Sequence, residues 1–390
     1  MTVTWDQPIF YAGDDLQDIR VARIQEQLSA RGLDALLLIK HDAIRYATGF
    51  YTKGYRPFLD IEYAAVIVAD GPVILGTMLH GEANRARIRS RADQVIELPK
   101  PRQWGPALEN VLRENGLEQA SIGFDFMPHW IHSHLRDALP GAELVESADF
   151  WSAMTAVKLP QEVELLKKAL DIAQLGMREA MRALSRNGVT ELEVAAAAEN
   201  AMRLSGSEMT PFISLVASGY NAALFERLAT TKKVGDGEMV VIDLGCVVQG
   251  YTGDFARTTA VGTPTSEQKR LYQAAHRAHL EALAAAKPGV RCGDIDDLIR
   301  AVLRDEGFER YTAGWATGHQ LGYGLHGSPV IGPGVDDELL PGMVINIEPA
   351  LFTPDRLDIG GVEIEDTLLI TEGGNERLTH FEYDARLLGD

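Results

Sequence analysis

The stretch Val241–Thr258, VIDLGCVVQGYTGDFART, holds two aspartates in a setting where carboxylates are uncommon. Its apolar residues predict two strands that are joined by a tight turn at Gly250. In a hairpin with a two-residue loop, the residue numbers of two directly paired residues add up to an odd number. The numbers of Asp243 and Asp254 also add up to an odd number, so both side chains are expected on the same face. Two like charges on a half-buried face repel each other unless a cation lies between them. The hairpin therefore indicates a cation site.

The bulk properties of the chain narrow the class of protein. At 390 residues it is long enough for two domains, and its formal net charge of -19 argues against a nucleic-acid surface. No apolar run reaches the length of a membrane span, and the first residues lack the pattern of a signal peptide. Cys246 and Cys292 are far apart and form no C-x-x-C motif, so we expect reduced thiols and a cytoplasmic protein.

Helix and strand patterns alternate in the first part of the chain. Helical apolar spacing occurs at residues 16–33 and 107–117, and strand patterns occur at residues 34–40, 64–76 and 121–125. The alternation predicts an α/β domain that occupies residues 1–155.

A long helix that begins at Pro160 marks the second domain, which we place at residues 156–390. Thr190 with Glu193, and Thr265 with Gln268, have the spacing of capping boxes and predict two further helix starts. Two more segments, GMVINIEPALF and GGVEIEDTLLIT, read as strands. The second domain is therefore expected to be α+β, with helices packed against an antiparallel sheet.

Three further segments of this domain place polar groups among apolar residues. His319 and His326 lie in GHQLGYGLHG, Glu348 lies in INIEP, and Glu365 lies in VEIED. Each is weak alone, because a lone histidine or strand glutamate is more often structural. Together with the hairpin they supply four carboxylates and an imidazole, which suit two divalent ions such as Mn, Fe, Co or Zn. Carboxylates can bridge ions roughly 3.5–4 Å apart, and a shared water then becomes hydroxide near neutral pH.

These segments resemble the motifs of the pita-bread metallopeptidase family, which contains methionine aminopeptidase, Xaa-Pro aminopeptidase, prolidase and creatinase. The creatinase and prolidase branch also carries an N-terminal α/β domain, so the resemblance extends over nearly the whole chain. It implies a pita-bread catalytic domain with five metal ligands: Asp243, Asp254, His319, Glu348 and Glu365. Asp254 and Glu365 would bridge the ions, and Glu348 would also handle the proton of the nucleophilic water. His326 matches the histidine that stabilises the tetrahedral intermediate.

Three positions near this site depart from the peptidases of the family. Glu226 and Trp315 stand where histidines are usual, and Glu363 replaces an arginine before the last ligand. As substrate-binding residues, the two glutamates and the indole ring would suit a small or cationic substrate. The alternatives are a solvated loop charge for Glu226 and simple packing for Trp315. For Glu363 the alternative is an outward-facing position, or an ion pair with an arginine such as Arg257.

The resemblance implies a hydrolase of the Xaa-Pro peptidase or prolidase type, which cleaves an amide or peptide bond with a hydroxide that bridges two metal ions. Manganese is the expected metal, with iron, cobalt or zinc as alternatives. A creatinase-like hydrolase or lyase of a small non-peptide compound remains open, as does a non-catalytic binding protein of the same fold.

The expected partners are a small molecule or a short peptide as substrate and a second copy of the chain, with no nucleic acid and no membrane. Relatives with this N-terminal domain commonly form homodimers in which it borders the partner's site. The aromatic-rich segment GYRPFLDIEY, around Arg56 and Asp60, is the part expected to reach across. Its alternative is a packed loop.

Overall fold

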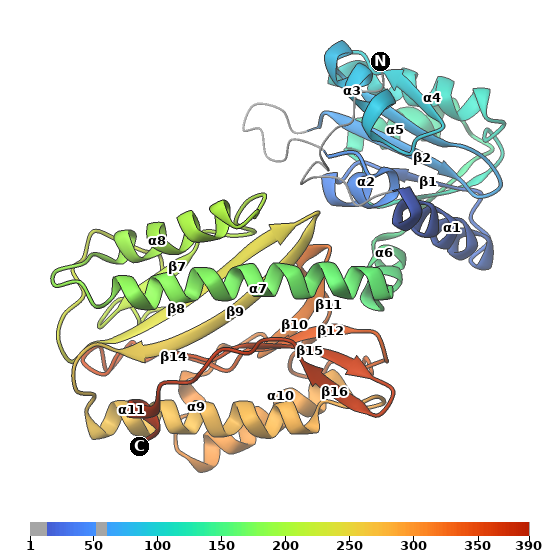
Figure 1. Cartoon of the computed structure of the whole chain (residues 1–390). Helices are drawn as coiled ribbons and strands as arrows, with labels where there is room; N and C mark the ends of the chain where they lie inside the picture. Colours follow the sequence, from blue (N-terminus) through green and yellow to red (C-terminus); the bar gives the residue numbers. More distant parts are fainter. Residues whose placement is uncertain (1–13, 52–60, 390) are drawn as a thin grey trace. The chain divides into compact units, whose positions relative to one another are not determined.

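The computed structural model describes residues 14–51 and 61–389, and Figure 1 shows their course. The chain forms two compact units, of which the first ends at Met154 and the second begins at Thr155. Residues 54–60, which belong to the segment expected to reach a partner subunit, lie outside the described residues. None of the helices in the described ranges combines the length and the apolar character that a membrane span requires.

The first unit contains a mixed six-stranded sheet with helices, which is the α/β architecture that its alternating pattern predicts. Its strand order is β4-β3-β2-β1-β5-β6, and β1 runs antiparallel to β2 but parallel to β5. The strands are β1 (Ala35–Leu38), β2 (Tyr63–Val68), β3 (Val73–Thr77), β4 (Gln94–Glu97), β5 (Ser121–Phe124) and β6 (Glu143–Glu146). The helices are α1 (Asp14–Ala30), α2 (His41–Thr48), α3 (His80–Arg89), η1 (Pro101–Gln103), α4 (Trp104–Glu114), α5 (His129–Ala138) and α6 (Ala148–Ala156). Leu37 of β1 and Trp104 of α4 belong to one buried apolar cluster, which joins the sheet to that helix.

The second unit is α+β, and every strand pair assigned in its sheets is antiparallel. The sheets have the orders β7-β8-β9, β11-β10-β12-β15-β16 and β13-β14. The strands are β7 (Leu215–Ser218), β8 (Met239–Val248), β9 (Tyr251–Ala260), β10 (Gly318–Gly322), β11 (Gly324–Ile331), β12 (Val344–Ile347), β13 (Ala350–Leu351), β14 (Val362–Glu363), β15 (Asp366–Thr371) and β16 (Gly374–Arg377). The helices are α7 (Pro160–Ala183), α8 (Glu191–Leu204), α9 (Ser266–Ala285), α10 (Cys292–Asp305), η2 (Glu309–Tyr311) and α11 (Ala385–Leu388).

Helices cover the strands of this unit from two sides. In Figure 1, α7 runs along β8 and β9, while α9 and α10 lie on the other side of the strands. Pro160 occupies the first turn of α7, where its missing N–H costs nothing, and Glu162 accepts a 2.9 Å hydrogen bond from the Leu159 N–H. Leu166 and Leu170 of α7 are fully buried. The expected packing of helices against antiparallel sheets is therefore confirmed.

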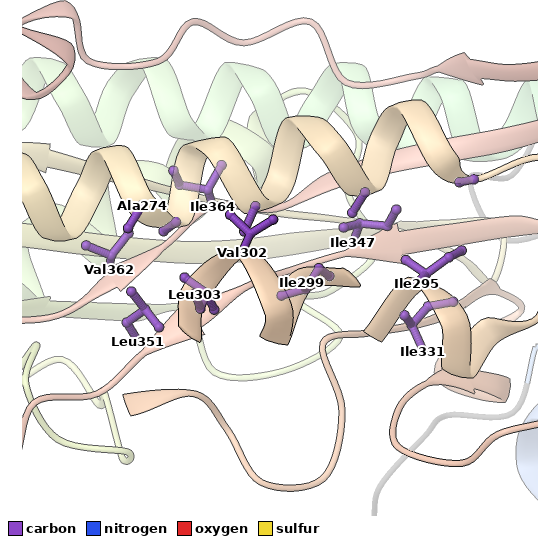
Figure 2. Close-up of a cluster of buried hydrophobic side chains, with 14 of the residues drawn as sticks. Ala274, Ile295, Ile299, Val302, Leu303, Ile331, Ile347, Leu351, Val362 and Ile364 are labelled. Carbon is purple, nitrogen blue, oxygen red and sulfur yellow. The ribbon is translucent and has the colours of Figure 1, made fainter. Parts of the chain in front are cut away.

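The largest core cluster of this unit lies directly behind two of the expected metal ligands. Figure 2 shows Ile347 and Ile364 in this cluster with Ile299 and Leu303 of α10. Both isoleucines are fully buried, and each is a chain neighbour of a predicted ligand glutamate. Successive side chains of an extended backbone point to opposite sides, so the anchored isoleucines turn the neighbouring glutamates away from the core.

The β8–β9 hairpin is closed by a tight turn and packed closely against α7. Gln249 and Gly250 have φ angles of 51° and 88°, which is the left-handed conformation that two-residue hairpin turns favour. A Cβ atom on Gly253 would lie 2.5 Å from the carbonyl carbon of Ala169 in α7. Only glycine allows this approach, so α7 sets the position of β9 just before Asp254.

Candidate metal centre

The two hairpin aspartates lie on one face of the sheet, which confirms the prediction from the sum of their residue numbers. Asp243 is opposite Ala256 in the β8–β9 register, and Gly245 is opposite Asp254, so the aspartates are diagonal neighbours. Asp254 is buried and Asp243 is partly buried. The Oδ1 atom of each is buried without a hydrogen-bond partner among the described residues. Such oxygens are costly unless a cation completes their coordination.

Glu348 and Glu365 lie at breaks in the two segments that read as strands in the sequence. The first segment divides into β12 and β13 around Glu348, and the second into β14 and β15 around Glu365. Each glutamate uses its backbone N–H outside a regular ladder: Glu348 donates to the Thr317 carbonyl at 2.9 Å, and Glu365 donates to the Ala256 carbonyl at 3.1 Å. Pro349 cannot donate to a ladder at all. The breaks bring these carboxylates beside the hairpin.

His319 lies on β10 and completes a compact group of donor atoms. Its Nδ1 is 3.1 Å from the carbonyl oxygen of Gln320, which favours a proton on Nδ1 and a free lone pair on Nε2. That Nε2 lies 3.7 Å from Oδ2 of Asp254 and 3.9 Å from Oε1 of Glu348. One donor atom from each of Asp254, His319 and Glu365 lies within 4.8 Å of the others. Three separate strand regions thus converge on one point.

The electrostatics of the group call for a cation. Burial raises the pKa of each of the four carboxyl groups, and the charge of neighbouring acidic groups raises it further: Asp243, Asp254, Glu348 and Glu365. Burial and the nearby His326 lower the pKa of His319 to about 4, so its imidazole is neutral at pH 7. Unpaired carboxylate oxygens and a neutral imidazole are ligands of divalent cations. The residues present therefore fit a divalent metal site.

His326 and Trp315 extend from the metal-binding group toward solvent. The ring of His326 meets that of His319 edge to face, with centroids 4.5 Å apart, and Trp315 meets His326 in the same way at 6.4 Å. Desolvation by its surroundings lowers the pKa of His326. The side chain of Trp315 is exposed, as is Glu226 on the loop that follows β7. The structure thus places His326 beside His319, and His326, Trp315 and Glu226 are all exposed at the surface.

Glu363 forms a buried ion pair, but its partner is not the arginine suggested by the sequence. Nη1 of Arg227 lies 2.5 Å from Oε2 of Glu363, and the side chains are 1% and 11% exposed. Arg257 binds Asp366 instead. Nothing in the sequence marks Arg227 as this partner, because it lies 136 residues from Glu363 and belongs to no motif.

A second buried network, also missed from the sequence, surrounds the residue after Glu365. Four side chains donate hydrogen bonds to Asp366: Arg257 at 2.7 Å, His279 at 2.8 Å, Tyr383 at 2.6 Å, and Thr379. We refer to these five residues as the Asp366 clamp. Although burial acts in the opposite direction, the Arg257 guanidinium holds the pKa of Asp366 below its usual range. Asp366 ends the VEIED segment and Arg257 lies in the GDFART segment. The opposite charges of these two residues were the sign in the sequence that could have predicted the pair.

Comparison with known proteins agrees with this geometry. A profile of metallopeptidase family M24 matches residues 164–372, and a profile of the creatinase/prolidase N-terminal domain matches residues 20–154. A Xaa-Pro dipeptidase of Pyrococcus horikoshii is 30% identical over 368 residues, which cover 94% of this chain and 99% of that protein. A Xaa-Pro dipeptidase of Lactobacillus delbrueckii is 30% identical over 385 residues, which cover 94% and 98%.

Solved structures show the same similarity in three dimensions. The prolidase from Pyrococcus horikoshii superposes with a TM-score of 0.81 at 30% identity, covering 94% of this chain and 99% of that one. The X-Pro aminopeptidase from Thermotoga maritima superposes with a TM-score of 0.83 at 25% identity, covering 94% and 98%. Both units of the chain therefore have counterparts in these structures.

Proposed function

The chain belongs to metallopeptidase family M24, and we propose that it hydrolyses the Xaa-Pro peptide bond of dipeptides at a centre of two divalent metal ions. Members of this family are metal-dependent hydrolases, and the relatives above are named for the cleavage of Xaa-Pro substrates. The observation that carries the proposal is the convergence of Asp254, His319 and Glu365 donor atoms within 4.8 Å. Asp243 and Glu348 lie next to this group, and the negative charge of neighbouring carboxylates raises the pKa of both.

The ligand set proposed for the two ions is Asp243, Asp254, His319, Glu348 and Glu365. By the family resemblance Asp254 and Glu365 would be shared by both ions; both side chains are almost fully buried, and their donor atoms lie within 4.8 Å of that of His319. Manganese is the proposed metal, with iron, cobalt or zinc as alternatives that the same oxygen-rich donors accept. When bound, such ions would polarise the scissile carbonyl and lower the pKa of a shared water.

Two residues of the chain are proposed to handle charge and protons during hydrolysis. Glu348 is 19% exposed in its side chain and therefore reaches the open side of the group, where it can accept a proton from water and pass it to the leaving nitrogen. His326 lies beside His319 and can donate a hydrogen bond to the oxyanion that develops on the substrate carbonyl. Desolvation lowers the pKa of His326, which favours the neutral ring with one N–H to donate.

The substrate-binding roles of Glu226, Trp315 and Glu363 remain part of the proposal in a modified form. Exposed Trp315 and Glu226 are proposed to contact the substrate. A small cationic non-peptide substrate has less support than a dipeptide, because the relatives above are named for the cleavage of Xaa-Pro substrates. The alternative of a non-catalytic protein has no support from the intact set of donor residues.

A homodimer and a cytoplasmic location are further parts of the proposal. Cys246 and Cys292 are free and buried, which agrees with a reducing compartment. Light scattering at micromolar concentration tests the homodimer, and a monomer mass would contradict it.

The decisive experiment measures metal content and turnover on the same preparation. We expect two divalent ions per chain by elemental analysis, hydrolysis of Xaa-Pro dipeptides such as Leu-Pro, and loss of hydrolysis after chelation with recovery on adding Mn²⁺. Trace metal only, with turnover unchanged by chelator, would contradict the metal proposal. Metal-loaded protein that leaves a panel of Xaa-Pro dipeptides intact but cleaves a small amide would contradict the substrate proposal.

A further inference from the structure

Glu363 is an additional acidic group on the metal-binding side of its segment. It lies two residues before Glu365, and the intervening Ile364 points into the core cluster shown in Figure 2. Side chains that flank an anchored residue in this way project together to the other side. Glu363 also raises the pKa of Asp254, Glu348 and Asp243, which requires that it lie within Coulombic range of them. Its side chain is 11% exposed, so it lies nearer the opening than Glu365.

The guanidinium of Arg227 is fully committed to protein groups. Besides its 2.5 Å contact with Glu363, it donates to the carbonyl oxygens of Ala222, Leu351 and Val362 at 3.2, 2.9 and 3.3 Å. Its Cζ atom lies 4.2 Å from the ring centre of Phe352. With a side chain only 1% exposed, Arg227 fixes the Glu363 carboxylate and is not placed to bind an anionic group of a ligand.

A buried carboxylate at the base of the loop holds Arg227 in this position. Glu191 accepts hydrogen bonds from the backbone N–H of Ser218 at 2.7 Å and from that of Thr230 at 3.1 Å. It also accepts from Asn221 Nδ2 at 3.0 Å. Both ends of the 218–230 loop are thus hydrogen-bonded to one fully buried side chain, which fixes the loop that carries Arg227.

We propose that Glu363 is the specificity-determining residue that binds the α-ammonium group of the substrate, with Arg227 as its positioning residue. Oε2 of Glu363 takes the guanidinium, and Oε1 accepts a hydrogen bond from the substrate ammonium. An arginine at this position would repel an ammonium group, whereas a fixed carboxylate attracts it. The inference rests on the proposed peptidase function and assigns the residue that recognises the amino terminus of the dipeptide.

The test compares Leu-Pro with its desamino analogue, 4-methylpentanoyl-proline, which lacks only the ammonium group. In the metal-loaded wild type, kcat/KM should be higher for Leu-Pro. Glu363→Gln should reduce the ratio of the two kcat/KM values by about tenfold or more, mainly through the KM of Leu-Pro. Because Glu363→Gln leaves a buried arginine uncompensated, the neutral pair Arg227→Gln with Glu363→Gln is the second variant, and it should lose the same preference.

Arg227→Gln alone is the matched control, because it keeps the carboxylate. It should retain a clear preference for Leu-Pro, although the KM rises as the carboxylate becomes less fixed. A preference that stays within about threefold of wild type in both Glu363 variants would overturn the inference. Equal loss of preference in Arg227→Gln would overturn a direct contact with Glu363. The peptidase proposal fails separately, since it requires the wild type to cleave Leu-Pro. Metal content, measured on every variant, distinguishes a lost contact from a lost metal.

Discussion

The guanidinium of Arg257 connects the two segments that carry Asp254 and Glu365, the proposed bridging ligands. Its Nη2 donates to Oδ1 of Asp366 at 2.7 Å, and its Nη1 donates to the backbone carbonyl of Glu365 at 2.6 Å. Arg257 follows Asp254 by three residues on β9. The Asp366 clamp therefore fixes the separation of Asp254 and Glu365 from behind, without contributing a side chain to the metal-binding group.

Weakening this clamp should weaken metal binding. His279→Leu removes the 2.8 Å contact with Asp366 and leaves the other three donors in place. We expect Mn²⁺ affinity, measured by isothermal titration, to fall about 10–100-fold, as found for residues that orient metal ligands. Stability should fall by about 1–3 kcal/mol. Arg277→Leu, on the exposed face of α9, is the control, since Arg277 pairs with Glu281 and Glu306 and lies outside the clamp. Equal loss of affinity in both variants would contradict a specific role for the clamp.

The Asp254 carboxylate should stabilise the metal-loaded protein and destabilise the metal-free one. Burial and the charge of Glu363 raise the pKa of Asp254, so its ionised form at pH 7 costs folding free energy when no cation is present. Asp254→Asn should abolish hydrolysis and the rise in Tm on adding Mn²⁺. In chelator, the variant should melt no lower than the wild type. Differential scanning fluorimetry measures both, with the exposed Asp171→Asn on α7 as control. A normal Mn²⁺ response in Asp254→Asn would refute the assignment.

Replacement of Gly253 should disturb the hairpin. The added methyl group of Gly253→Ala would meet the backbone of Ala169 at 2.5 Å, and neither backbone can move without displacing α7 or β9. We expect a loss of about 1–3 kcal/mol in urea denaturation, with reduced metal affinity because Asp254 is the next residue. Gly314→Ala is the matched control, because a Cβ atom there meets nothing within 4 Å and its φ angle is not positive. If the stability of Gly253→Ala is unchanged, α7 can move away from the added methyl group, which would contradict this argument.

A pH effect is expected where the C-terminal segment attaches to β9. Burial acts to raise the pKa of Asp384, but hydrogen bonds from Arg386, Thr259 and the Ala260 N–H outweigh it and hold the pKa below its ordinary value. The pKa of Asp384 is thus lower in the folded than in the unfolded protein. Its carboxylate therefore contributes fully to the free energy of unfolding above about pH 4, and this contribution is lost as the pH falls further.

The change that tests this contribution is Asp384→Asn, compared with wild type in urea at several pH values. The difference in urea midpoint between wild type and Asp384→Asn should be largest and equal at pH 7 and pH 5, and it should become smaller at pH 3.5. The exposed neighbour Glu382→Gln is the control and should show little difference at any pH. A difference that grows on acidification would give the opposite sign and contradict the argument.

The parts of the structure that depend on local patterns could be predicted from the sequence. The Thr190 and Thr265 capping boxes and the helix start at Pro160 are all present, because each signal acts within one helical turn. The shared face of Asp243 and Asp254 also follows from a local rule, the period of two along a strand.

The strand breaks at Glu348 and Glu365 could not be predicted in this way. The apolar residues around them favour continuous strands, and the breaks depend on the carbonyl groups of Thr317 and Ala256, which are distant in the chain. The pairing of Glu363 is of the same kind. Arg257 and Arg227 were both chemically suitable partners, and only the three-dimensional arrangement assigns Arg227 to Glu363.

The tight turn of the β8–β9 hairpin determines where this chain can tolerate a change in length. A residue inserted at Gln249 or Gly250 would enlarge the turn and leave the paired strands unchanged. A single residue inserted at positions 244–248 or 251–253 would shift one arm of the ladder and turn one aspartate to the opposite face. Homologous hairpins that keep both carboxylates should therefore vary in length at the turn and keep the number of residues between each aspartate and the turn fixed.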